Sequence, residues 1–219
     1  MKRPRVCAVI TSDEPEAIKE SEPLVDLFEV RIDLVGDGWQ ELVKRINRPW
    51  IACNRRVDEG GRWRGDEAKR VEELLKAIES GADMIDIELR TKNLEEAVKK
   101  IKNRAKCLLS FHQLKRTPPL EEMKGIVRRQ LEAGADICKV VTTAQRPEDN
   151  LTVLQLIGEA TGIRRVSFAM GPLGLTSRVL CPLVGGDFTY ASIDKGKESA
   201  PGQIAVRELR QIYEMMGNG

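Results

Sequence analysis

Short apolar segments alternate along this chain with longer amphipathic segments. Eight of the short segments are rich in β-branched and other apolar residues, and most are apolar throughout rather than alternating with polar positions. Continuous apolar runs of this length are typical of strands that are covered on both faces. The predicted strands span residues 5–11, 27–34, 50–55, 84–89, 107–111, 137–143, 166–170 and 188–193.

The segments between these strands have the spacing of helices that bury one face. Apolar residues recur at i, i+3, i+4 and i+7, for example from Val71 and from Leu94. Proline favours the first turn of a helix, and glycine favours the position after the last turn. On this basis helices begin near Pro118, Pro147 and Pro201 and end just before Gly81, Gly134 and Gly162.

Eight strands that alternate with helices predict a parallel sheet, and eight such units predict closure into a (β/α)8 barrel. A Gly-Ala-Asp sequence recurs at 81–83 and 134–136, which also indicates repeated units. We therefore expect a single domain over residues 1–219. An open doubly wound sheet is the main alternative, but no G-x-G-x-x-G loop follows the first strand.

Composition narrows the classes of partner. The 36 Lys and Arg residues nearly balance the 34 Asp and Glu residues, so neither nucleic acid nor a membrane surface is expected as a partner. The five cysteines are odd in number and form no C-x-x-C pair, which argues against disulfides and zinc and favours a reducing compartment. No apolar run is long enough for a signal peptide or a membrane span, so we expect a cytoplasmic protein.

Two basic residues fall where barrel enzymes place their chemistry, at the carboxyl ends of strands. Lys139 interrupts an apolar strand, which indicates either an amine nucleophile or a lysine paired with a barrel carboxylate. Burial and neighbouring cations lower the pKa of a lysine, so we expect a depressed pKa here. His112 is the only histidine and ends the preceding strand, so a barrel places it beside Lys139, as a proton carrier or as a structural residue.

Acidic and basic residues share strand faces nearby. Glu29, Arg31 and Asp33 alternate, so all three are expected on one face of the second strand, and Asp86 and Glu88 share a face of the fourth strand. These carboxylates are either structural ion pairs or, as an alternative built from Asp33, Asp86 and Glu88, ligands of Mg²⁺.

The remaining candidates bind anions or cover the site. Arg55 and Arg178 follow the third and seventh strands, where their guanidinium groups suit a substrate carboxylate or phosphate. For Arg56 a surface salt bridge is the better interpretation. The polar segment 194–203 after the last strand is expected to be a simple connector or a lid.

Taken together, the motifs resemble those of the type I 3-dehydroquinate dehydratase family over almost the whole chain. They are E-x-R-x-D at 29–33, an arginine at 55 followed by E-G-G at 59–61, S-x-H at 110–112, A-D-I-x-K at 135–139, M-G and S-R at 170–171 and 177–178, and S-A-P-G-Q at 199–203. One departure is Cys53, which replaces a more usual hydroxyl residue two positions before the arginine.

The resemblance implies a reaction and a role for each matching residue. Lys139 would form an imine with 3-dehydroquinate, His112 would move the proton, and Glu59 would orient His112. No metal or cofactor is implied, the product would be 3-dehydroshikimate, and the family is often dimeric, so a homodimer is an expectation. The residues expected to bind the substrate are Glu29, Arg31, Arg55, Met170, Arg178, Ser199 and Gln203.

Three other functions remain open at this point. A class I aldolase would share Lys139 and the barrel, but we find no Gly-rich phosphate loop after the seventh strand. A Mg²⁺-dependent barrel would use the carboxylates named above. A non-catalytic barrel would bind a small acid without turnover.

Overall fold

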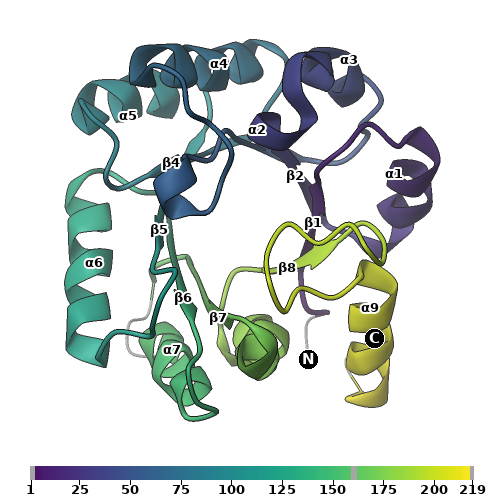
Figure 1. Cartoon of the computed structure of the whole chain (residues 1–219), viewed down its shortest axis with the longest axis vertical. Coiled ribbons are helices and arrows are strands. Elements are labelled where there is room, and N and C mark those ends of the chain that lie inside the picture. The colour runs from purple at the N-terminus through teal and green to yellow at the C-terminus, as the bar shows by residue number, and fades with distance from the viewer. Residues whose placement is uncertain (1–2, 159–161, 218–219) are drawn as a thin grey trace.

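The computed structural model describes residues 3–158 and 162–217, and within them eight parallel strands form a nearly closed barrel inside a ring of helices (Figure 1). The strands are β1 (Val6–Ile10), β2 (Leu27–Arg31), β3 (Trp50–Cys53), β4 (Met84–Glu88), β5 (Lys106–His112), β6 (Ile137–Thr143), β7 (Arg165–Met170) and β8 (Thr189–Ser192). Each strand pairs with the next in sequence from β1 to β7, and β8 pairs with β1. The predicted (β/α)8 barrel is confirmed.

The helices follow the strands in the predicted alternation. They are α1 (Pro15–Ser21), α2 (Ile32–Val35), α3 (Trp39–Val43), α4 (Glu67–Glu79), α5 (Leu94–Lys102), α6 (Leu120–Glu132), α7 (Asp149–Gly158), α8 (Leu175–Leu180) and α9 (Val206–Met215). The stripes that begin at Val71 and Leu94 lie on α4 and α5 and pack toward the strands, as expected.

The recurring Gly-Ala-Asp sequence lies between the end of a helix and the start of the next strand. Gly81 and Gly134 both have φ +94°, a left-handed conformation that glycine adopts without strain, and each turns the chain out of its helix. The aspartate two residues later accepts a hydrogen bond from an amide in the first two residues of the neighbouring strand: Asp83 from Trp50 at 2.9 Å, and Asp136 from Cys107 at 2.8 Å. These bonds set the register at the amino-terminal ends of the strands.

The barrel interior follows the period of two that strands impose. On β6, Ile137 and Val141 face the interior together with Lys139, whereas Cys138 and Val140 pack outward against helices. The polar group of Lys139 is therefore placed at the centre of the barrel by the same alternation that buries its apolar neighbours.

Several strands are shorter than expected, β3 for example ending at Cys53 and not at residue 55, and two of the differences in element ends involve residues near the carboxyl ends of the strands. The second strand ends at Arg31 and not at residue 34, and Asp33 lies in the first turn of α2, where its carboxylate accepts hydrogen bonds from the amides of Arg55 and Arg62. Pro201 does not begin the last helix, because α9 begins at Val206, after Ala205, whose amide donates to Glu208. The carbonyl of Pro201 instead accepts a hydrogen bond from Gly171.

Candidate active site

A cavity of about 270 Å³ opens at the carboxyl end of the strands. That volume suits a small organic molecule. The structure brings all the residues predicted from the sequence for catalysis and binding into its lining: Glu29, Arg31, Arg55, Glu59, His112, Lys139, Met170, Arg178, Ser199 and Gln203.

Lys139 lies at the bottom of this cavity, and its side chain is only 5% exposed. Its Nζ donates hydrogen bonds to Asp86 at 2.8 Å, to Glu29 at 3.3 Å and to the hydroxyl of Tyr190 at 2.9 Å. Burial acts to lower the pKa of Lys139, but the charges of Asp86 and Glu29 outweigh it and raise that pKa. The expected depression is therefore wrong for the free protein, which holds Lys139 as an ammonium group.

Asp86 is shared between two cations. Its Oδ2 lies 2.7 Å from Nη2 of Arg55 and 2.8 Å from Nζ of Lys139, and its Oδ1 accepts a hydrogen bond from Ser110 at 2.6 Å. Burial opposes ionisation, but Arg55 and Lys139 lower the pKa of Asp86 strongly, so the carboxylate stays ionised. Asp86 thus fixes Arg55 and Lys139 relative to one another.

Glu88 links this pair to the outer layer of helices. One of its oxygens lies 2.9 Å from Arg55, and the other lies 2.6 Å from Arg70, which comes from α4 and is fully buried. Arg70 was missed by sequence reasoning, because a charged residue on an amphipathic helix is normally solvated. Its guanidinium also binds Glu67, Thr91 and the carbonyl of Asn54.

The carboxylates considered as Mg²⁺ ligands all pair with cations of the chain. Asp33 forms two hydrogen bonds with Arg31, at 2.8 and 2.7 Å, and Asp86 and Glu88 are bound as described above. In the described part of the chain one cluster of potential ligand atoms forms around Glu29, Cys53 and Asp86, but Glu29 and Asp86 both bind the ammonium group of Lys139. The ion-pair interpretation therefore fits these residues better than a metal site.

His112 and Glu59 form a buried pair at the end of β5. One oxygen of Glu59 accepts a hydrogen bond from the His112 amide at 2.9 Å and lies 3.0 Å from Nδ1 of its ring. Burial and the nearby cations Arg55 and Lys139 lower the pKa of His112, while burial raises the pKa of Glu59 to about 7. Because Nδ1 is engaged, Nε2 is the ring nitrogen left for a proton transfer in the cavity.

Arg178 is a buried cation with no carboxylate beside it among the described residues. It is 1% exposed, its Nη1 donates to the carbonyl of Tyr190 at 3.3 Å, and its Nε and Nη2 have no hydrogen-bond partner. Its guanidinium lies 4.2 Å from the ring centre of Phe168. Burial lowers the pKa of Arg178 to about 10, so it remains charged at neutral pH. A buried, uncompensated guanidinium in a cavity is suited to bind an anion.

The segment after β8 covers one side of the cavity. Oε1 of Gln203 accepts hydrogen bonds from the amide and the hydroxyl of Ser199, at 2.7 and 3.1 Å. Gly202 has φ +74°, and a Cβ there would lie 2.2 Å from the carbonyl oxygen of Gly171, so only glycine allows the segment to lie this close to the end of β7. The segment is therefore packed onto the site through close backbone contacts.

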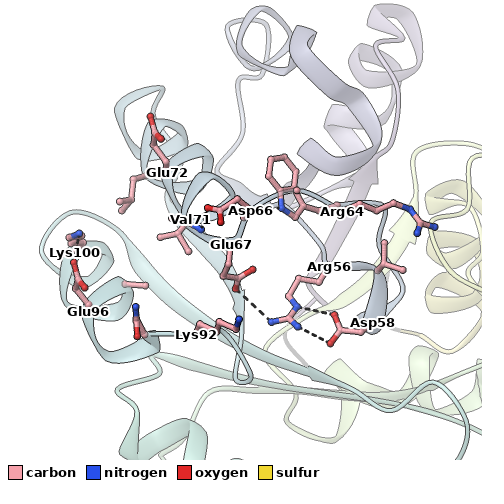
Figure 2. Close-up of a pocket in the computed structure, with 17 residues that line it drawn as sticks. Arg56, Asp58, Arg64, Asp66, Glu67, Val71, Glu72, Lys92, Glu96 and Lys100 are labelled. Carbon is pink, nitrogen blue, oxygen red and sulfur yellow. Dashed lines mark hydrogen bonds and ion pairs between the residues drawn. The ribbon is translucent and has the colours of Figure 1, made fainter.

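A larger cavity, of about 1040 Å³, lies outside the barrel along α4 and α5 (Figure 2). Its charges pair with one another, for example Arg56 with Asp58 at 2.8 Å and Lys100 with Glu96 at 2.6 Å. The expected surface salt bridge of Arg56 is confirmed. None of the residues predicted to act in catalysis lines this groove, so we assign the active site to the smaller cavity.

The fold and this cavity define the class of protein: a (β/α)8 barrel in which a lysine, a histidine and an uncompensated arginine line one cavity at the carboxyl ends of the strands. A family model described as Type I 3-dehydroquinase matches residues 6–219. The chain belongs to this family, and the expected enzyme class, a dehydratase among the lyases, is confirmed.

Relatives and solved structures agree with this assignment. The chain is 44% identical over 214 residues to a 3-dehydroquinate dehydratase of Dehalococcoides mccartyi, covering 97% of this chain and 96% of that protein. It is 35% identical over 219 residues to one from Methanocaldococcus jannaschii, covering 96% and 98%. The crystal structure of the Geobacillus kaustophilus 3-dehydroquinate dehydratase has a TM-score of 0.86 at 26% identity, covering 99% of this chain and 96% of that one.

No helix in the described residues is long and apolar enough to cross a membrane. The cytoplasmic location and the homodimer stay predictions.

The state of the His112–Glu59 pair can be measured without assignment, because the chain has one histidine. We expect ¹H–¹⁵N NMR to show that the imidazole ring becomes protonated only well below pH 6.5, since burial and the charges of Arg55 and Lys139 lower the pKa of His112. Glu59→Gln should leave the midpoint of this titration low, because the raised pKa of Glu59 makes its carboxyl group largely neutral in the pH range where His112 titrates. A midpoint at or above 6.5 in the unmodified protein would contradict this description.

Proposed function

We propose that this protein dehydrates 3-dehydroquinate to 3-dehydroshikimate through an imine between Lys139 and the substrate ketone, as a step of the shikimate pathway of aromatic biosynthesis. The observation that carries the proposal is the grouping around one small cavity of a buried lysine amine, a neutral histidine and an uncompensated arginine. These three groups supply a nucleophile, a proton carrier and a binding site for the carboxylate of the substrate.

Imine formation conserves charge. The Lys139 ammonium group and the ketone give an iminium ion and one molecule of water, as the C–N bond forms and the ketone oxygen leaves with two protons. Glu29, which accepts a hydrogen bond from Lys139, is placed to take up a proton before the amine attacks. The iminium ion is an electron sink, so the neighbouring C–H bond becomes acidic.

His112 then moves one proton. Its Nε2 removes the proton next to the iminium carbon, and the electron pair of that C–H bond flows into the iminium to give an enamine. The enamine electrons return to expel hydroxide, which takes the proton from His112 and leaves as water. Addition of water to the product imine releases 3-dehydroshikimate and restores Lys139. Glu59 orients His112 throughout, because it binds both the amide and Nδ1.

The substrate-binding roles are assigned to side chains that line the cavity. Arg178 is the partner for the carboxylate, with Gln203 and Ser199 closing over it from the segment after β8. Met170 offers an apolar wall for the ring. The hydroxyl groups of the ring are assigned to Glu29, Arg31 and Arg55, whose side chains also line the cavity.

Replacing the nucleophile and the proton carrier should have different consequences. Lys139→Ala should lower kcat by more than about 10⁴-fold, because no imine can form. His112→Ala should lower kcat by about 10²–10⁴-fold while still allowing imine formation. The measurement is product formation by absorbance, with circular dichroism and thermal unfolding to verify the fold. Activity of Lys139→Ala close to that of the unmodified protein would rule out the mechanism.

Removing the uncompensated cation should weaken substrate binding without harming the fold. We expect Arg178→Met to lower kcat/KM by roughly 100-fold, since a charge-assisted contact to the carboxylate is lost. The melting temperature should stay the same or rise, because no buried carboxylate is left unpaired. Arg178→Lys is the matched control, and its kcat/KM should fall between the values of the unmodified protein and of Arg178→Met. An unchanged kcat/KM in Arg178→Met would exclude Arg178 from the binding site.

A further inference from the structure

Tyr190 is an uncharged residue in contact with the reactive nitrogen, and the motifs in the sequence gave it no role. It lies at the second position of β8, is 3% exposed and lines the cavity. Its hydroxyl oxygen lies 2.9 Å from Nζ of Lys139, and the centre of its ring lies 4.0 Å from the same atom. One side chain therefore meets the nitrogen with both a hydrogen-bond acceptor and the face of an aromatic ring.

The surroundings hold this ring rigidly. The ring centre of Phe168 lies 6.0 Å from that of Tyr190. The ring centre of Phe188 lies 5.4 Å from it, and these two rings pack edge to face. Burial and the carboxylate of Glu29 raise the pKa of Tyr190, so its hydroxyl stays protonated and neutral. Tyr190 is thus no proton acceptor in this site, and its contribution to the nitrogen is that of a neutral, electron-rich surface.

The nitrogen of Lys139 carries a positive charge in two states of the proposed cycle, as the ammonium ion of the free enzyme and as the iminium ion. The face of an aromatic ring attracts a cation, and the attraction is largest where water is excluded. We propose that Tyr190 is a positioning residue that holds the Lys139 nitrogen as a cation in both states, with its ring facing the charge and its hydroxyl accepting an N–H. For the iminium ion this inference rests on the proposed imine mechanism, whereas for the ammonium ion of the free enzyme it does not.

Such a residue has opposite effects on two steps. It keeps the imine protonated, and only a protonated imine draws electrons from the neighbouring C–H bond. It also favours the ammonium form of the free lysine, so fewer molecules have an amine ready to attack. Other groups around the nitrogen must remain constant in any test of the ring. They are Cys7 on β1, Glu29 on β2, Cys53 on β3, Arg55 after β3, Asp86 on β4 and His112 on β5.

Fluorination of the ring isolates this contribution, because it withdraws electron density from the ring face with little change in shape. Position 190 would carry, in separate proteins, phenylalanine (Tyr190→Phe) and its 4-fluoro, 3,5-difluoro and 3,4,5-trifluoro derivatives. The measurement is the rate at which cyanate carbamylates Lys139 at pH 8, followed by peptide mass spectrometry. That rate is proportional to the fraction of free amine.

We expect the rate to rise with each added fluorine, by about tenfold from phenylalanine to the trifluoro derivative, which corresponds to a fall of about one unit in the pKa of Lys139. The same derivatives at Phe188 form the matched control, since that ring packs against Tyr190 but does not line the cavity. They should leave the rate unchanged, and the exposed Lys44 should react equally in every protein.

A rate that does not rise with fluorination at position 190, or rises equally for position 188, overturns the inference. The proposed function is tested separately, because carbamylation needs no substrate. If the unmodified protein forms no borohydride-trapped adduct with 3-dehydroquinate, the imine mechanism fails whatever the cyanate rates are. If it forms the adduct while the rates stay flat, the role of Tyr190 alone fails.

Discussion

The site depends on keeping ionised groups inside the barrel, where each unpaired charge is costly. Three carboxylates and three cations meet this requirement together: Glu29, Asp86, Glu88, Arg55, Arg70 and Lys139. They form one continuous series of contacts from α4, through the ends of β3 and β4, to the amine on β6. The position of Lys139 therefore depends in part on Arg70, Asp86 and Glu88, which do not line the cavity.

The balance of this series explains the state of the reactive groups. Around Lys139 the carboxylates outweigh burial and raise its pKa, whereas around His112 burial and the cations dominate and lower its pKa. Arg178 lies apart from these ion pairs and has no carboxylate beside it among the described residues, and in the proposed function the carboxylate of the substrate supplies the missing negative charge. An ammonium ion, a neutral imidazole and an unpaired guanidinium thus coexist in one cavity because each has a different set of neighbours.

Much of this arrangement could be predicted from the sequence. The apolar runs and helical stripes located the eight βα units, and the rule that barrel sites lie at strand ends brought Lys139 and His112 together. The prediction of a depressed pKa for Lys139 is wrong. It took burial into account, but the sequence does not show which carboxylates lie beside the amine.

Other features could not be predicted because they depend on the path of the chain in space. From the sequence Arg70 would be taken for a solvated residue on an amphipathic helix. Only the packing of α4 against β4 shows that it pairs with the buried Glu88. From the sequence Tyr190 would be taken for a core aromatic residue, because only the nearly closed barrel brings its side chain and Lys139 into the same cavity. The end of the second strand at Arg31 depends on backbone amides of a neighbouring loop, which Asp33 binds.

The central claim is that a covalent bond forms between Lys139 and the substrate ketone. The most direct measurement is intact-protein mass spectrometry after incubation with 3-dehydroquinate and borohydride, followed by peptide mapping. We expect one stable adduct per chain, on the peptide that contains Lys139, and none in Lys139→Ala. Continued dehydration without any adduct in the unmodified protein would contradict it.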